Sequence, residues 1–175
     1  MNSVRIVDDN EVIARILHKD WVVDGQLQVF AFVLRSNESY ISVNRPSIET
    51  FKEDVSDFVG NHPEFRSSEE VLSCKLAKMS VKDVRTIQVD LGSLSADVSV
   101  DVEPRSLHYH SHAGIFTRVN GKNLKGGPQT ADHEDEYRIL PVRAIHQKVQ
   151  HALLALSKLE ECQLDSKRSV FRVGE

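Results

Sequence analysis

Three histidines, His108, His110 and His112, occupy alternate positions in one short stretch of the chain. Side chains two residues apart in a β-strand point to the same face, so a strand here would bring the three imidazoles together. Neutral imidazoles bind zinc, iron or copper, and they are costly to bury without a partner. The stretch is therefore a candidate site for zinc or another divalent metal ion, although the sequence alone establishes no cofactor.

A catalytic zinc site needs three protein ligands and one open position. His110 and His112 supply two ligands, and His108 or an acid from the cluster at residues 132–136 would complete the set. Within that cluster, Glu134 and Glu136 are candidate general bases for a metal-bound water. The alternative is an exposed strand edge that carries histidines on its polar face.

The segment Tyr109–Gly114 reads YHSHAG and resembles the YHSHPG signature of JAMM metallopeptidases, in which both histidines bind zinc. In that family a serine and a zinc-binding aspartate follow eight and eleven residues after the second histidine. Here those positions hold Asn120 and Asn123. Asparagine carries no negative charge, so this local resemblance implies a metal site that lacks its acidic ligand.

The segment His112–Phe116 is similar to the HxGIY strand around the catalytic histidine of NlpC-type peptidases, which pair that histidine with a cysteine. Cys74 lies in a strand-like run, and Cys162 lies at the expected C-terminus of a helix, where the dipole raises the pKa of a thiol. These positions argue against a cysteine–histidine pair.

A wider resemblance rests on Ala31-Phe32, Ile41–Arg45 (ISVNR) and Ser111–Ile115 (SHAGI). In this order they resemble a group of small, uncharacterised bacterial proteins. The resemblance implies a bacterial, cytoplasmic protein and singles out Ser111 and Gly114 beside His112. It brings no activity with it.

The chain has 175 residues, of which 40% are hydrophobic and 27% charged, and a net charge of −4. This length and composition predict one soluble domain over residues 1–175. The negative charge disfavours nucleic acid as a partner, and the apolar runs are too short to cross a membrane. The start of the chain does not read as a signal peptide, and the two cysteines read as reduced thiols of a cytoplasmic protein rather than a disulfide framework.

Hydrophobic periodicity predicts an α+β fold, in which two or more amphipathic helices pack on a mainly antiparallel sheet. Asp24-Gly25 and Asn120-Gly121 predict tight hairpin turns. A polar connection at about 121–138 is expected to be mobile or to act as a lid. The expected helices cover residues 12–17, 47–58 and 141–159, and the expected strands cover residues 29–34, 39–43, 74–81, 94–102 and 169–173.

These observations leave open whether the chain is an enzyme. Because no motif is complete, we expect a small binding or accessory protein that acts through a surface for a partner. The partner would be another protein or a second copy of the chain. The alternative is a metal-dependent hydrolase built on the His-x-His strand.

Overall fold

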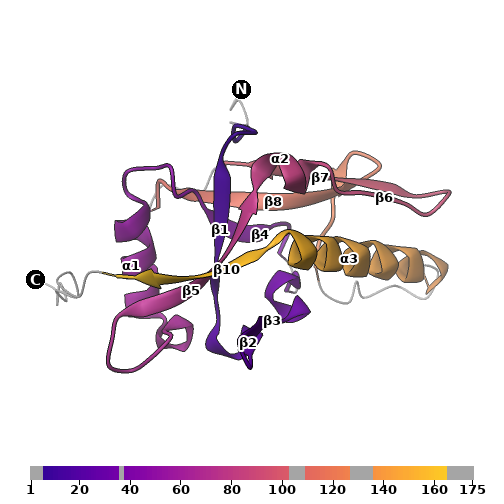
Figure 1. Cartoon of the computed structure of the whole chain (residues 1–175). Coiled ribbons are helices and arrows are strands. Elements are labelled where there is room, and N and C mark those ends of the chain that lie inside the picture. Colours follow the sequence, from indigo (N-terminus) through magenta and orange to yellow (C-terminus); the bar gives the residue numbers. More distant parts are fainter. Residues whose placement is uncertain (1–5, 36–37, 103–108, 127–135, 165–175) are drawn as a thin grey trace, which may run out of the picture.

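The computed structural model describes residues 6–35, 38–102, 109–126 and 136–164, and the side chains of 136–141 are not considered. Within these ranges one antiparallel sheet has the strand order β10, β5, β1, β4, β8, β7, β6, with β9 paired to β8. The sheet is strongly curled, with α1 near one end and α3 alongside the other (Figure 1). The mixed α+β class and the antiparallel sheet are therefore as predicted.

The strands are β1 (Val12–Leu17), β2 (Val22–Val23), β3 (Gln26–Leu27), β4 (Ile41–Asn44), β5 (Ser73–Ser80), β6 (Gln88–Asp90), β7 (Ser95–Asp101), β8 (His112–Val119), β9 (Lys122–Asn123) and β10 (Lys158–Gln163). The α-helices are α1 (Phe51–Asn61), α2 (Val81–Arg85) and α3 (Glu136–Leu156). Short 3-10 helices are η1 (Lys19–Trp21), η2 (Val29–Phe32) and η3 (Pro63–Phe65).

Both predicted hairpin turns are confirmed. Asp24 and Gly25 join β2 to β3 with φ values of 49° and 76°, and Asn120 and Gly121 join β8 to β9 with 50° and 78°. Two successive positive φ values make a type I′ turn, whose twist suits antiparallel strands.

The helix predicted over residues 12–17 is wrong, because this segment is strand β1 between β4 and β5. Ile13 and Leu17 pack in one core, whereas Ala14 and Ile16 pack in the other. A strand buried on both faces is apolar almost throughout, and such a run matches a helical spacing equally well.

The central strand predicted over residues 29–34 is also wrong. Residues 29–32 form η2, where Ala31 and Phe32 are buried while Phe30 is 58% exposed. A short apolar run shows no periodicity that separates a strand from a helical turn. The strand that follows this segment, β4, pairs with β1 and β8.

The C-terminal helix begins and ends earlier than predicted. α3 starts at Glu136 rather than at Pro141 and ends at Leu156. The predictions for Leu159 in the helical stripe and for Cys162 at a helix C-terminus are wrong, since both residues lie on β10, which pairs with β5. The strand predicted over 169–173 lies outside the described residues.

The connection predicted at 121–138 includes β9 and the buried Leu124, whose N–H donates to Thr117 O at 2.7 Å. Residues 127–135, with Glu134, lie outside the described part. No helix in the described part is both long and apolar enough to span a membrane.

The described residues form two hydrophobic cores against the sheet. The larger joins residues of β1, β4, β7 and β8 to α2, α3 and η2, and its α3 members are Ile145, Val149 and Leu153. The smaller joins α1 to β1 and β5 through Phe51, Val55, Val59, Ala14, Cys74 and Leu76, together with Leu164.

Candidate functional site

The histidine stretch is not a continuous strand. His112 is the first residue of β8, whereas His110 is exposed in the turn before it. That turn is closed by a hydrogen bond from His112 N–H to Tyr109 O at 3.0 Å. His110 and His112 therefore lack the strand alternation that was predicted to align them, and His108 lies outside the described residues.

The cause of this turn is a buried polar network around Ser111. The Ser111 N–H donates to Asp54 Oδ2 at 2.8 Å, and Ser111 O accepts from Arg45 N–H at 2.8 Å. Asn44 Nδ2 donates to Ser111 Oγ at 2.9 Å. Ser111 is fully buried, so the candidate site residue Ser111 anchors the chain and is not exposed to a ligand.

Two acids of α1 hold this turn from the helix side. Asp54 lies in the first turn of α1 and also accepts from Thr50 Oγ1 at 3.1 Å. Three residues later, Asp57 accepts from the Tyr109 hydroxyl at 3.1 Å. Burial and the hydrogen bond to Asp57 raise the pKa of Tyr109. The position of α1 therefore fixes where β8 begins.

His112 meets a serine of the neighbouring strand. The register pairs Asn44 with His112 and Ser42 with Gly114, so Ser42 and His112 are diagonal neighbours on one face of the sheet. Ser42 Oγ lies 2.5 Å from His112 Nε2, and Ser42 is exposed while His112 is half-buried. This pair combines a hydroxyl and an imidazole within hydrogen-bonding distance at the surface.

Two aromatic rings flank this pair. The Tyr40 ring centroid lies 5.9 Å from that of His112 and 5.2 Å from that of Phe116. Both aromatic side chains are half-buried. The candidate residue Gly114 makes room for them, since a Cβ at this position would lie only 2.7 Å from Tyr40 Cδ2. We call the surface formed by Tyr40, Ser42, His112 and Phe116 the open face.

An ion pair lies next to the open face on β7 and β8. Asp101 is directly opposite Gly114, and its Oδ2 accepts from Arg118 Nη2 at 2.8 Å and from Ser99 Oγ at 3.0 Å. The alternation of residues 94–102 places Asp101 on the polar side of the predicted strand, which should face water, but Asp101 is only 4% exposed. The prediction failed because strand alternation does not show which polar side chain a neighbouring arginine will cover.

The residues of the predicted metal site lie only partly within the described ranges. Glu134 lies outside them, and of Glu136 only its place at the start of α3 is described. In the described ranges, no group of three or more histidine, cysteine or acidic side chains is placed to hold a metal ion. The zinc prediction on His108, His110 and His112 therefore stays a prediction.

Sequence reasoning missed Tyr40, Ser42 and Phe116. The sequence predicted a strand over residues 39–43 but did not single out Ser42 or Tyr40 on it. Nothing local, however, indicates that β4 pairs with β8 in the register that joins Ser42 to His112. The chain matches no protein-family model, no curated protein and no solved structure in the comparisons made with each.

Proposed function

We propose that this chain is a small binding or accessory protein and that the open face recognises a protein partner. The observation that carries the proposal is the pair of half-exposed rings, Tyr40 and Phe116, beside the hydrogen-bonding pair Ser42 and His112. Aromatic side chains are enriched at the centres of protein interfaces, where they bury large areas with few rotatable bonds.

The charges around the open face also favour a protein over a nucleic acid. Arg118 is paired with the buried Asp101, and the exposed Asp97 lies opposite Arg118 on β7. The arginine that lies beside the open face on β8 is therefore already paired with acids, whereas phosphate binding depends on unpaired positive charge. A second copy of the chain is one form that the protein partner can take.

We propose that the protein acts in the cytoplasm of a bacterial cell. In this proposal, α1 and α3 serve as amphipathic helices that cover parts of the sheet and leave the open face accessible. Their buried residues, Val55 on α1 and Ile145 and Leu153 on α3, are consistent with that role.

Site-specific photo-crosslinking tests the proposal. A benzophenone amino acid is placed at Phe116 in the source cell, and a matched control carries it at Val71, which is 51% exposed in the segment before β5. We expect one discrete protein adduct at position 116, at least tenfold weaker when Tyr40→Ala is added. Adducts no stronger at 116 than at 71 would overturn the proposal, and an adduct formed by the purified chain alone would identify self-association.

A second candidate function is hydrolysis at Ser42, favoured by the 2.5 Å contact between Ser42 Oγ and His112 Nε2. A histidine at this distance can accept the serine proton while the hydroxyl oxygen attacks an acyl carbon. The bond from that carbon to the leaving group then breaks, the imidazolium gives its proton to the leaving group, and water releases the acyl group from the serine. A fluorophosphonate probe tests this function directly. Covalent labelling of Ser42 that falls at least tenfold in His112→Gln would support it, and an unlabelled Ser42 in the folded protein would exclude it.

The metal-dependent hydrolase predicted from the sequence uses the same histidine. Its test is the metal content of protein purified without an affinity tag, compared between the wild type and a His110→Ala, His112→Ala variant. Stoichiometric zinc that the variant loses would support this alternative. Absence of bound metal, with no change of melting temperature on adding zinc, would exclude it.

A further inference from the structure

The two cysteines of the chain lie directly opposite each other on adjacent antiparallel strands. Cys162 of β10 is the register partner of Cys74 of β5, and both thiols are free. Two residues further along, Leu164 N–H donates to Leu72 O, which makes Leu72 and Leu164 a hydrogen-bonded pair. Hydrogen-bonded pairs recur at every second residue of antiparallel strands, so Cys74 and Cys162 also form such a pair. Their Cα atoms are about 5.5 Å apart. That separation lies within the range that a disulfide spans.

We infer that Cys74 and Cys162 form a reversible redox pair, which a peroxide converts into a disulfide that links β5 to β10. Register partners on adjacent strands point to the same face of the sheet, and Cys162 packs against the core that contains Cys74. The two sulfur atoms can therefore meet after a small approach of the edge strand β10 to β5. The inference is independent of the proposed function.

The two thiols have different roles because their surroundings differ. Cys74 is completely buried in the core beneath α1, whereas Cys162 is half-buried at the sheet edge. A hydrogen bond from the adjacent Cys74 thiol is the main cause that lowers the pKa of Cys162 to about 7. Lys52 and Lys78 also lower this pKa, whereas burial and Glu160 raise it. The same hydrogen bond and burial raise the pKa of Cys74. Cys162 is therefore the thiol that ionises and meets the oxidant.

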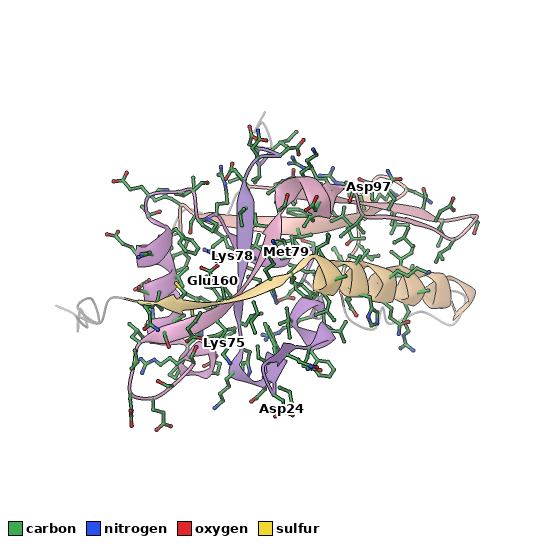
Figure 2. The ribbon with its side chains drawn as sticks, viewed as in Figure 1. Asp24, Lys75, Lys78, Met79, Asp97 and Glu160 are labelled. Atoms are coloured by element: carbon green, nitrogen blue, oxygen red, sulfur yellow. The ribbon has the colours of Figure 1, made fainter. Side chains whose placement is uncertain are left out.

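The charged groups around the pair lie on three elements. Lys78 Nζ of β5 contacts Glu160 Oε1 of β10 at 2.7 Å, and Figure 2 shows these two side chains together where the strands pair. Lys52 belongs to α1, and Glu161 lies beside Cys162 on β10. Lysines from both α1 and β5 thus favour the thiolate of Cys162 over its protonated form.

The reaction has two steps. The Cys162 thiolate attacks one oxygen of hydrogen peroxide, the O–O bond breaks, and Cys162 sulfenic acid and hydroxide form. The Cys74 sulfur then attacks the sulfenic sulfur, which loses its oxygen as water once the thiol proton is transferred. Two thiols are oxidised by two electrons in total, and the peroxide is reduced. A low-molecular-weight thiol reverses the change by thiol–disulfide exchange.

A Cys74–Cys162 disulfide would link β10, the last described strand, covalently to the sheet. Within the described ranges, β10 lies at the edge of the sheet and pairs with β5 alone, and it directly follows α3. In the reduced protein, backbone hydrogen bonds and the Lys78–Glu160 ion pair hold it in place. A disulfide adds a covalent link at the centre of this contact, so oxidation should slow the local opening of β10.

The test uses the purified full-length chain with one to two equivalents of hydrogen peroxide, followed by alkylation and peptide mass mapping. We expect a Cys74–Cys162 disulfide in the monomer, with the loss of two hydrogen atoms and full reversal by dithiothreitol. The rate should rise with pH through about 7, as Cys162 ionises. Hydrogen exchange of the β10 amides should be slower in the oxidised form.

Two variants distinguish the roles of the thiols. In Cys74→Ser, Cys162 should give a sulfenic acid that dimedone traps, and in Cys162→Ser, Cys74 should stay a thiol. Disulfide-linked dimers, or Cys162 oxidised to sulfinic acid while Cys74 stays free, would overturn the inference. Peptide mapping of the wild type alone decides the matter if a variant does not fold.

Discussion

Gly114 is the residue that the packing of the open face restricts most strongly. A Cβ there would lie 2.7 Å from Tyr40 Cδ2 and 2.9 Å from Phe116 Cε2, so both rings would have to move. Overpacking of this kind costs about 1–3 kcal/mol. We therefore expect Gly114→Ala to lower the free energy of unfolding by that amount in urea denaturation.

Gly60→Ala is the matched control for this substitution. Gly60 lies within α1, and a Cβ there would meet nothing within 4 Å. Alanine in a helix is favoured over glycine by up to about 1 kcal/mol, so this variant should be at least as stable as the wild type. Adding Tyr40→Ala to Gly114→Ala should remove part of the cost. A stable Gly114→Ala protein would contradict the described ring positions.

Glu11 is the carboxylate whose titration should be visible in the stability of the protein. Arg45 donates to it from Nε at 2.9 Å and from Nη2 at 2.6 Å, and these bonds outweigh burial to lower the pKa of Glu11 from 4.5 to about 2. A pKa that is lower in the folded state stabilises the fold above the unfolded pKa. This contribution should be lost as the pH falls from about 4.5 to about 2.

Urea midpoints measured between pH 7 and pH 2 test the role of Glu11. Glu11→Gln should cost about 1–3 kcal/mol at pH 7, because Arg45 loses its ionised partner. As the pH falls below 4.5, the free energy of unfolding should then decrease less in the variant than in the wild type. Glu70→Gln, an exposed control before β5, should follow the wild-type curve. Parallel curves for Glu11→Gln and the wild type would refute this assignment.

Among the elements, those with a clear local signal were predicted correctly. The alternation of residues 94–102 predicted β7, the spacing of Phe51, Val55 and Phe58 predicted most of α1, and the two turns carried their own sequence signature. β1 and η2 were wrong because both are short apolar runs, whose periodicity fits more than one structure. β10 was missed because Leu159 continues the apolar spacing of α3, so the start of the strand was taken into the helix.

The candidate site depends on pairings that no local pattern contains. Ser42 meets His112, and Cys74 meets Cys162, only because of the strand order and register of the sheet. The turn that moves His110 away from His112 is likewise set by Asp54, which belongs to a distant helix. The sequence could therefore single out His112 as a candidate site residue but not the residues that surround it.

The contact between α1 and the turn before β8 can be tested through Asp54. This acid is 7% exposed and accepts the Ser111 N–H, so Asp54→Ala leaves a buried donor without its acceptor. We expect a loss of about 1–3 kcal/mol in the free energy of unfolding. Exchange of the Ser111 amide should become faster, and the NMR signals of His110 and His112 should shift.

Asp57→Ala is the control on the same helix. Asp57 is exposed and accepts only from the Tyr109 hydroxyl among the hydrogen bonds described for its carboxylate. Its removal should cost less than Asp54→Ala and leave the exchange of the Ser111 amide unchanged. Equal effects of the two variants would show that Asp54 does not fix the turn.

The whole molecule is organised around a sheet that separates two cores. β1 belongs to both, since Ile13 faces the larger core and Ala14 faces the smaller one. Arg15 of the same strand reaches across to Ser42 O at 2.7 Å and stacks over Trp21, with its guanidinium 5.0 Å from the ring centroid. Such shared elements predict that the two cores unfold together, as in a single domain.

Leucine-to-alanine substitutions in each core provide the test. Leu76 in the smaller core and Leu153 in the larger are at most 1% exposed, so each change should cost about 2–5 kcal/mol. If the chain is one cooperative unit, Leu76→Ala should accelerate hydrogen exchange of the slowest amides of β7 and α3. The acceleration should match the loss in the free energy of unfolding that the substitution causes. The exposed Val23→Ala should leave these amides unchanged. If Leu76→Ala affected only α1, β5 and β10, the chain would contain two separable folding units, and the disulfide between β5 and β10 would then stabilise one of them alone.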